Sequence, residues 1–398
     1  MSNRIEEKKI LRLVYAISIV AFSIIALYSK DNTAILMGVF SVALIWYAYF
    51  IIRKYYPDGD KYILVLSALL SVIGMFMLYR IKPFYGIRQL SWFTIGIAIF
   101  ILIVVVFPDI ESIANFKYFY LTVELGFLFM TQIFGVDIKG SKNWISLGPI
   151  GFQPSEFSKL FLILYLASAL KDFKDRKQLI EPALVTLTSI GLLVLQKDLG
   201  TAIIFFVISI TMVYIGTSNI KYILLSIVLF IFGGIGSYYA FAHVRSRIAI
   251  WIDPWKTATD SGYQIVQSLF AIASGGFLGS GLYRGHPNYI PEVHNDFIFA
   301  IICEEMGLLG GIAVILIFFL LAYRGLRTAI YANNTFSRLV ALGISTMIGS
   351  QVFIIIGGVI KLIPLTGITL PLVSYGGSSF IISFMSLGIL QKISEADV

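Results

Sequence analysis

An acidic cluster with one histidine lies in the last third of the sequence and contains the residue types of a general base. Glu292, His294 and Asp296 stand at alternate positions, and Glu304 and Glu305 follow shortly afterwards. A carboxylate becomes a stronger base when burial or neighbouring acids raise its pKa above the ordinary value, about 3.9 for Asp. Asp296 is the candidate base, and the glutamates are candidates for raising its basicity. The alternative is that Asp296 only caps the helix that follows it.

A metal site is a second interpretation of the same cluster. It would use Glu292, His294 and Asp296, with His286 as a further ligand. The spacing matches no zinc motif, so we expect no dedicated metal site. A loosely held Mg²⁺ or Mn²⁺ on the carboxylates fits a substrate that brings its own phosphate groups.

A second charged group stands where an apolar run begins. Pro154 suits the first turn of a helix, and Gln153 or Ser155 is expected to cap it. Glu156 and Lys159 are three residues apart and therefore share one face of that helix, where they can neutralise each other. The pair is either part of a functional site or an ion pair that only locks two helices together.

Two further carboxylates are predicted to lie in or at apolar helices. Asp198 follows Lys197 and precedes an apolar run, so it either caps that helix or serves a site. Glu124 lies inside an apolar run and must find a partner on another helix or be protonated.

Small residues dominate the stretch from Pro364 to Ser379, which includes Ser374 and Ser378. Glycines beside a tyrosine also occur in potassium filters, but the filter order threonine-valine-glycine-tyrosine-glycine is absent, so a channel is not expected. Small residues also allow helices to approach closely, which is a purely structural explanation.

The elements that position these residues are membrane helices. Of 398 residues, 58% are hydrophobic and 13% are charged, against about 25% charged in a soluble domain. The net charge of +8 lies in short connectors, so the expected polyanions are lipid headgroups or phosphorylated lipids and not nucleic acid. The single cysteine, Cys303, excludes an intrachain disulfide and a cysteine metal cluster.

Apolar runs of spanning length predict an all-α bundle of about 12 membrane helices. The basic start of the chain is interpreted as part of an anchor and not of a signal peptide. The connector 242–296 is too long for a turn and is expected to be a long outer loop. The distribution of Lys and Arg favours both termini in the cytoplasm, with a basic outer surface suited to an anion. The runs are 10–28, 33–52, 62–79, 89–107, 116–134, 157–170, 181–196, 199–215, 220–241, 297–322, 339–360 and 376–391.

Four stretches, in this order and spacing, resemble the SEDS family (shape, elongation, division and sporulation), whose bacterial members include RodA, FtsW and SpoVE. They are Gln-Pro-Ser-Glu-Phe (153–157), Asp-Leu-Gly-Thr-Ala (198–202), Pro-Glu-Val-His-Asn-Asp-Phe-Ile-Phe-Ala (291–300) and Ser-Tyr-Gly-Gly-Ser-Ser (374–379). The resemblance covers about residues 61–392 and implies a core of ten spans over residues 61–398. Residues 1–60 would then be an added pair of N-terminal helices.

The resemblance implies a glycosyltransferase of the bacterial cytoplasmic membrane that polymerises lipid II into glycan strands at the outer face. The usual partner would be a class B penicillin-binding transpeptidase. Asp296 falls on the catalytic aspartate of the family, and Glu156, Lys159 and Asp198 on positions that line its central cavity. The candidate substrate-binding residues are Lys139, Lys142, Trp144, Glu156, Lys159, Asp198, Arg245, Arg247, Glu292, His294, Ser374 and Ser378.

Joining an α-linked lipid pyrophosphate donor to a sugar hydroxyl with a β product is one inversion, which needs a base and cations for the leaving group. The cations would come from Lys139, Lys142, Arg245, Arg247 and Arg284. A lipid II flippase would also need intramembrane charges and a cavity, and a scaffold for a transpeptidase would need neither. The acidic cluster around Asp296 favours the enzyme, because a flippase has no use for a base at one face.

Overall fold

The computed structural model describes residues 2–57, 59–138, 141–148 and 150–396, most of which are helical. Each predicted apolar run coincides with one long helix, so the all-α prediction is confirmed. These helices are α1 (Ser2–Ser29), α2 (Thr33–Tyr55), α3 (Tyr62–Ile81), α4 (Pro83–Val105), α5 (Lys117–Phe134), α6 (Pro154–Leu170), α7 (Ile180–Leu195), α8 (Leu199–Thr217), α9 (Ile220–Ala240), α12 (Ile298–Tyr331), α13 (Thr335–Val359) and α14 (Gly377–Ala396).

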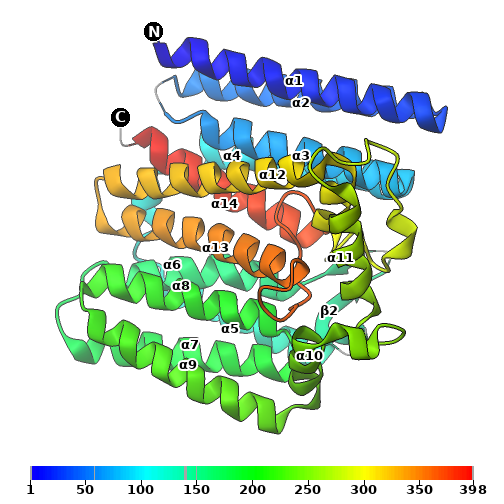
Figure 1. The fold of residues 1–398 in the computed structure, drawn as a ribbon. Coiled ribbons are helices and arrows are strands. Elements are labelled where there is room, and N and C mark those ends of the chain that lie inside the picture. The colour runs from blue at the N-terminus through cyan, green and yellow to red at the C-terminus, as the bar shows by residue number, and fades with distance from the viewer. Residues whose placement is uncertain (1, 58, 139–140, 149, 397–398) are drawn as a thin grey trace.

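Among the described residues, nine helices are long and apolar enough to cross a membrane. The predicted runs outside this group are α5, α6 and α14. Helix α6 has only 17 residues and carries an ion pair, and α14 is rich in serine. These three helices lie alongside the others in the bundle (Figure 1), with α5 against α6 and α14 against α4.

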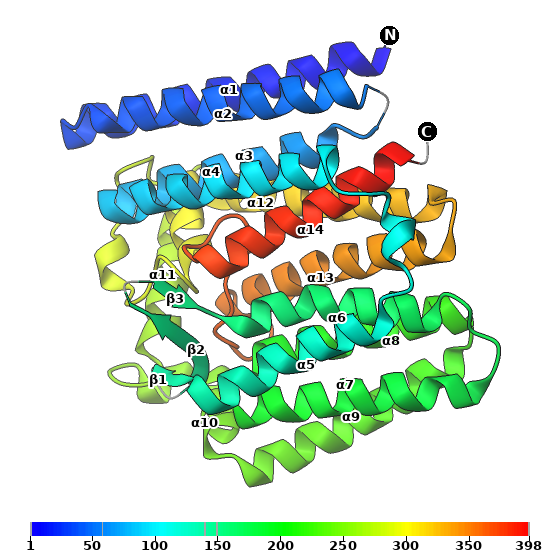
Figure 2. The ribbon, with the colours of Figure 1, turned by 180° about the vertical axis from the view of Figure 1, so that it is seen from behind.

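Helices of similar hydropathy differ in how far the protein buries them. In α3, 94% of the apolar window is buried in the protein, whereas none of the window of α9 is. Helix α9 lies at the edge of the bundle opposite α1 and α2 (Figures 1 and 2). A helix that is apolar on all sides and not covered by protein is expected to face lipid.

The two ends of the bundle differ in structure. Both termini lie at one end, whereas the strands and the helices α10 (Ala242–Ile252) and α11 (Tyr263–Gly275) lie at the other (Figures 1 and 2). The segment 242–296 is therefore not one long loop, because it folds into these two helices and the short 3-10 helices η3 (Pro254–Thr257) and η4 (Pro287–Tyr289). Two further 3-10 helices, η1 (Ile110–Ile113) and η2 (Arg176–Leu179), connect long helices.

A small antiparallel sheet between α5 and α6 is an addition to the predicted fold. Its strands are β1 (Val136–Ile138), β2 (Ser141–Leu147) and β3 (Ile150–Phe152), in the order β1-β2-β3. Trp144 pairs with Val136, and Ser146 pairs with Gly151. The sheet closes one side of the end at which α10 and α11 lie (Figure 2).

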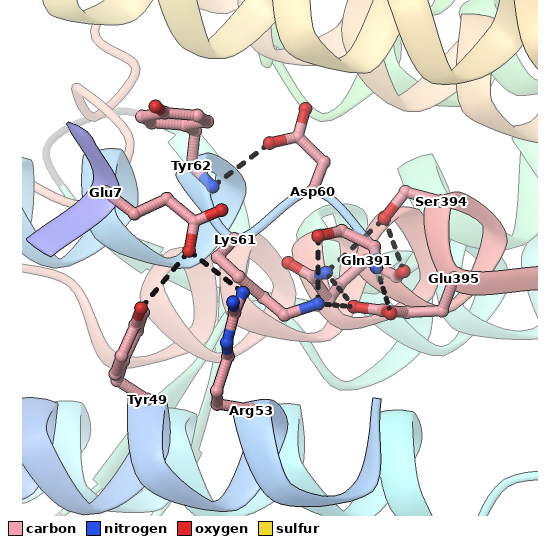
Figure 3. A network of polar contacts seen from close by, with 10 residues as sticks. Glu7, Tyr49, Arg53, Asp60, Lys61, Tyr62, Gln391, Ser394 and Glu395 are labelled. Atoms are coloured by element: carbon pink, nitrogen blue, oxygen red, sulfur yellow. Dashed lines mark hydrogen bonds and ion pairs between the residues drawn. The ribbon is translucent and has the colours of Figure 1, made fainter. Parts of the chain in front are cut away.

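At the end with the termini, charged side chains are paired in the interior (Figure 3). Lys61 and Glu395 are 2.8 Å apart, and both side chains are almost fully buried. Glu7 of α1 accepts hydrogen bonds from Tyr49 and Arg53 of α2. Since an unpaired charge is costly to bury, these pairs fix the helix ends relative to one another.

Candidate functional site

A cavity of about 820 Å³ lies at the end of the bundle that carries the sheet, α10 and α11. Residues of α4, β2, α6, α10 and α11 line it, together with the segments 292–296 and 365–377. This volume is within the range of about 300–1,000 Å³ that is usual for small-molecule sites. The charged side chains in its wall are Arg88, Glu156, Arg247, Glu292 and Asp296.

Asp296 lies in the cavity wall near a partly buried cation, Arg247. Burial lowers the pKa of the Arg247 guanidinium, and the charges of Asp296 and Asp198 oppose this effect. Arginine remains protonated in proteins, so a positive charge stands close to the candidate base. Arg247 Nη1 also donates to Leu365 O at 2.9 Å, which holds the guanidinium in place.

Gly367 lies in the cavity wall beside Asp296 and Arg247. Its φ of +74° favours glycine, and a Cβ there would stand 3.7 Å from both Asp296 Oδ2 and Arg247 Nη2. The carboxylate and the guanidinium therefore flank the same position of the wall.

The backbone around Asp296 is fixed by the serine-rich stretch. Ser374 Oγ donates to Asn295 O at 2.6 Å and accepts from the backbone N–H of Leu370. The N–H of Tyr375 donates to His294 O at 2.9 Å. The predicted substrate-binding residue Ser374 therefore positions the segment that carries the candidate base and is not part of the cavity wall.

The N-cap residue of α12 is Phe297 and not Asp296. The two other members of the acidic cluster in the wall are Glu292 and His294, whose Oε2 and Nε2 atoms are 3.8 Å apart. The His294 ring is stacked on Tyr85, with a centroid distance of 4.1 Å and an angle of 11°. This stack connects the segment 292–296 to the start of α4.

Glu304 and Glu305 do not line the cavity. Glu305 pairs with Arg80, with Nε and Oε1 2.9 Å apart, and Glu304 accepts the backbone N–H of His286 at 3.0 Å. Their carboxylates hold the segment before the site in place. Among the glutamates expected to raise the basicity of Asp296, Glu292 is the one in the cavity wall.

The predicted pairing of Glu156 with Lys159 is confirmed. Lys159 Nζ and Glu156 Oε2 are 2.8 Å apart, and the side chains are only 1% and 4% exposed. Lys159 also donates to Gln351 Oε1 on α13 at 2.8 Å, and Gln351 Nε2 donates to Thr369 O at 2.9 Å. Glu156 faces the cavity, so the pair links the wall to α13 and to the segment 365–371.

Asp198 caps α8, as predicted, and also crosslinks the layer behind the cavity. Its Oδ1 accepts the backbone N–H of Thr201, while Oδ2 accepts from Ser155 at 3.1 Å and from Asn143 and Gln153 at 3.4 Å. Gln153, one of the two predicted caps, is the N-cap residue of α6, but its side chain makes no capping hydrogen bond. The side chains of both Gln153 and Ser155 turn to Asp198 instead.

The remaining predicted residues divide into three groups. Trp144 lines the cavity, and Ser378 lies behind it, where its Oγ accepts the N–H of Gln153. Lys142 and Arg245 donate to backbone carbonyls of Gln132 and Tyr239 and do not line the cavity. Arg284 likewise lies elsewhere, near Tyr28. Lys139 lies outside the described residues.

Arg88, which was not among the predicted site residues, lies in the cavity wall together with Trp92. Arg88 Nη1 is 3.5 Å from the Tyr375 hydroxyl, and its guanidinium lies over the Phe84 ring. Its position near the outer start of an apolar run was the available signal. Glu124, for which no partner was predicted, accepts from Ser189 Oγ of α7 at 2.7 Å.

Within the described ranges, no group of three His, Cys, Asp or Glu side chains is arranged to hold a metal ion. Glu292 and Asp296 nevertheless both present carboxylates to the cavity.

Comparisons with known proteins give one consistent result. The model of the cell cycle protein family of FtsW, RodA and SpoVE matches residues 59–397. Peptidoglycan glycosyltransferase RodA of Mycobacterium tuberculosis (strain ATCC 25618 / H37Rv) is 34% identical over 387 residues, which cover 90% of this chain and 82% of that protein. Stage V sporulation protein E of Bacillus subtilis (strain 168) is 34% identical over 356 residues, covering 84% of this chain and 97% of that protein.

A solved structure has the same fold. It is described as "Structural coordination of polymerization and crosslinking by a peptidoglycan synthase complex", and one of its chains superposes with a TM-score of 0.75 at 28% identity. The match covers 85% of this chain and 98% of that chain. The family match begins at residue 59, so α1 and α2 lie outside it.

Proposed function

The chain belongs to the FtsW, RodA and SpoVE family of cell cycle proteins, and on this premise we propose that it polymerises lipid II into β-1,4-linked glycan strands. It is a peptidoglycan glycosyltransferase embedded in the membrane. The observation that carries the proposal is the placement of Asp296 in a cavity wall, where Gly367 adjoins both Asp296 and Arg247.

The reaction follows from these groups. A sugar hydroxyl of the acceptor gives its proton to Asp296 as its oxygen attacks the anomeric carbon of the donor. The bond from that carbon to the lipid pyrophosphate breaks on the opposite face, and the pyrophosphate leaves with the electron pair. This single displacement inverts the α-linked donor to a β-linked product.

Arg247 and Arg88 are the arginines of the cavity wall and would bind the pyrophosphate. A guanidinium has five N–H donors in a fixed plane and binds phosphate with two of them. Arg247 donates one hydrogen bond from Nη1 to Leu365 O, and the other N–H groups of its guanidinium remain as donors for phosphate. A divalent cation would fit as a companion of the pyrophosphate, with the Glu292 carboxylate as a ligand in the cavity wall, where it would neutralise charge on the leaving group.

Arg247 and Arg245 provide a matched pair for testing this assignment. We expect Arg247→Gln to lower kcat/KM for lipid II by roughly 10- to 100-fold, the range for losing a charged hydrogen bond. Arg245→Gln should stay within about twofold of the parent, because Arg245 is exposed and bonds to Tyr239 O. Steady-state rates with purified variants measure both, and equal losses would refute the assignment of Arg247.

We further propose that both termini are cytoplasmic and that the cavity opens at the outer face. The arrangement in Figure 1, with both termini at the end remote from α10 and α11, supports this orientation. Lys174 lies in the connector between α6 and η2, and Lys256 lies in η3 between α10 and α11. Both are exposed, and these two segments lie at opposite ends of the bundle (Figures 1 and 2). Cysteines introduced there should label from opposite sides of the membrane, with little background from the buried Cys303. Labelling of both from one side would contradict the orientation.

We also propose a class B penicillin-binding transpeptidase as the partner. The support is the related chain in a solved complex whose description couples polymerization to crosslinking. Such a partner would crosslink the strands that emerge from the cavity.

A vesicle experiment separates polymerisation from transport. We expect vesicles that contain the protein and lipid II to accumulate glycan polymer. Lipid II should move between the inner and outer leaflets no faster than in vesicles without the protein. Rapid exchange of lipid II between the leaflets without polymer would support the flippase and overturn the proposal.

A further inference from the structure

Helix α12 is broken close to the site. Gly307 has φ 70° and ψ −173°, which divides the helix into residues 298–306 and the remainder. The segment 276–281 fills the break with backbone hydrogen bonds. Ser280 and Gly281 donate to the carbonyls of Glu304 and Glu305 at 2.9 and 3.0 Å, and Leu308 donates to Gly276 O at 2.9 Å. Backbone groups that a helix break leaves unpaired are thus satisfied by this segment.

The break matters because Asp296 directly precedes the first part of α12. The angle of residues 298–306 therefore helps to determine where the carboxylate stands in the cavity wall. Whatever holds the segment 276–281 in the break also helps to hold Asp296.

A buried cluster fixes the continuation of this segment. Arg80 of α3 bonds to Glu305 at 2.9 Å and donates through Nη2 to Gly285 O at 2.8 Å. Glu305 in turn accepts the backbone N–H of Tyr283 at 2.9 Å. The Arg80 guanidinium also lies 4.3 Å from the centre of the Tyr283 ring.

The N-terminal hairpin of α1 and α2 contacts this cluster. Tyr28 near the end of α1 stacks on Tyr283 with a centroid distance of 5.7 Å and an angle of 10°. Its hydroxyl accepts from Arg284 Nη2 at 3.2 Å. The turn between the helices is itself tied to α3, because the Tyr79 hydroxyl bonds to Asp31 and Thr33. Figure 1 shows that α1 reaches the end of the bundle where α10 and α11 lie.

We propose that the hairpin α1–α2 is a positioning brace for the active site: through Tyr28 on Tyr283 it holds the segment 276–286 in the α12 break and thereby keeps Asp296 in place. This element lies outside the family match, so the brace is a feature added to the shared core. The catalytic consequence rests on the proposed function, whereas the structural coupling does not.

Three variants test the brace. Tyr28→Ala removes the stack, Tyr28→Phe keeps the stack but loses the hydroxyl, and Tyr47→Ala removes an exposed tyrosine elsewhere on the hairpin. Hydrogen exchange of amides 276–286 reports the coupling without catalysis. In Tyr28→Ala we expect hydrogen exchange of these amides to become faster. We expect kcat to fall by about three- to tenfold, which corresponds to the loss of one stacked aromatic pair. The KM for lipid II should be nearly unchanged. Tyr28→Phe and Tyr47→Ala should stay within about twofold of the parent in both measurements.

Several results would overturn the brace. One is unchanged exchange and kcat in Tyr28→Ala, and another is an equal effect of Tyr47→Ala. A lowered melting temperature with kcat unchanged at a temperature where the variant is folded would show that the hairpin only stabilises the protein. If the parent made no glycan, the proposed function would fail, and the exchange measurement alone would decide on the brace.

Discussion

Asp296→Asn is expected to fold, insert and bind its partner nearly as the parent does, while polymerisation falls by roughly 100-fold or more. Asparagine has almost the same shape as aspartate but cannot accept a proton at neutral pH. Asp296 also interacts electrostatically with Arg247, which is only partly buried, so the substitution changes the charge of the site without leaving a fully buried charge unpaired. Glycan formed from lipid II by equal amounts of purified proteins measures the effect.

Asp260→Asn is the matched control for this substitution. Asp260 also lies in the segment 242–296, but it is exposed and does not line the cavity. Its replacement should leave polymerisation near the parental rate. Equal activity of Asp296→Asn and the parent, with divalent ions present, would mean that the catalytic centre lies elsewhere.

Glu156→Gln is expected to damage both stability and activity. The substitution leaves the buried Lys159 ammonium without its carboxylate, which costs about 3–5 kcal/mol when the pair is fully buried. Gln351 still accepts one hydrogen bond from Lys159 at 2.8 Å, but an amide oxygen does not neutralise the charge. Membrane yield and the midpoint of thermal unfolding should therefore fall together with the rate.

The double variant Glu156→Leu with Lys159→Met separates the two roles. Replacing both buried charges by apolar groups of similar volume is often neutral for stability. We therefore expect the double variant to regain yield and thermal stability but not polymerisation, because Glu156 also faces the cavity. Unchanged yield and polymerisation in Glu156→Gln would show that the pair belongs neither to the core nor to the site.

The long helices could be predicted because membrane helices leave a signal along one stretch of sequence. Lipid cannot satisfy backbone polar groups, so each span needs an uninterrupted apolar run. The sheet 136–152 and the helices α10 and α11 have no such signal. Their residues pack against other segments, and short elements of mixed polarity depend on contacts that are distant in the sequence.

Only part of the site could be predicted, because the sequence shows which charged residues lie near apolar runs but not which of them come together. Asp296 and Glu156 were identified as charges at the starts of apolar runs and Arg247 as a basic residue of the outer loop, and the structure places all three in the cavity wall. Residue type alone could not separate Arg247 from Arg245, because the two are only two positions apart on α10 and their faces are set by tertiary packing. The role of Ser374 as a backbone support depends on a contact with Asn295, which is 79 positions away.

The most direct test of the account is whether the purified chain makes glycan from lipid II in detergent micelles, where exchange between leaflets cannot contribute. The account predicts a ladder of glycan products that grows with time and disappears after digestion by a β-1,4-specific muramidase. It also predicts that the ladder is absent with Asp296→Asn. The account is contradicted if the parent, with its transpeptidase partner present, leaves lipid II unconsumed, or if Asp296→Asn produces the same ladder at the same rate.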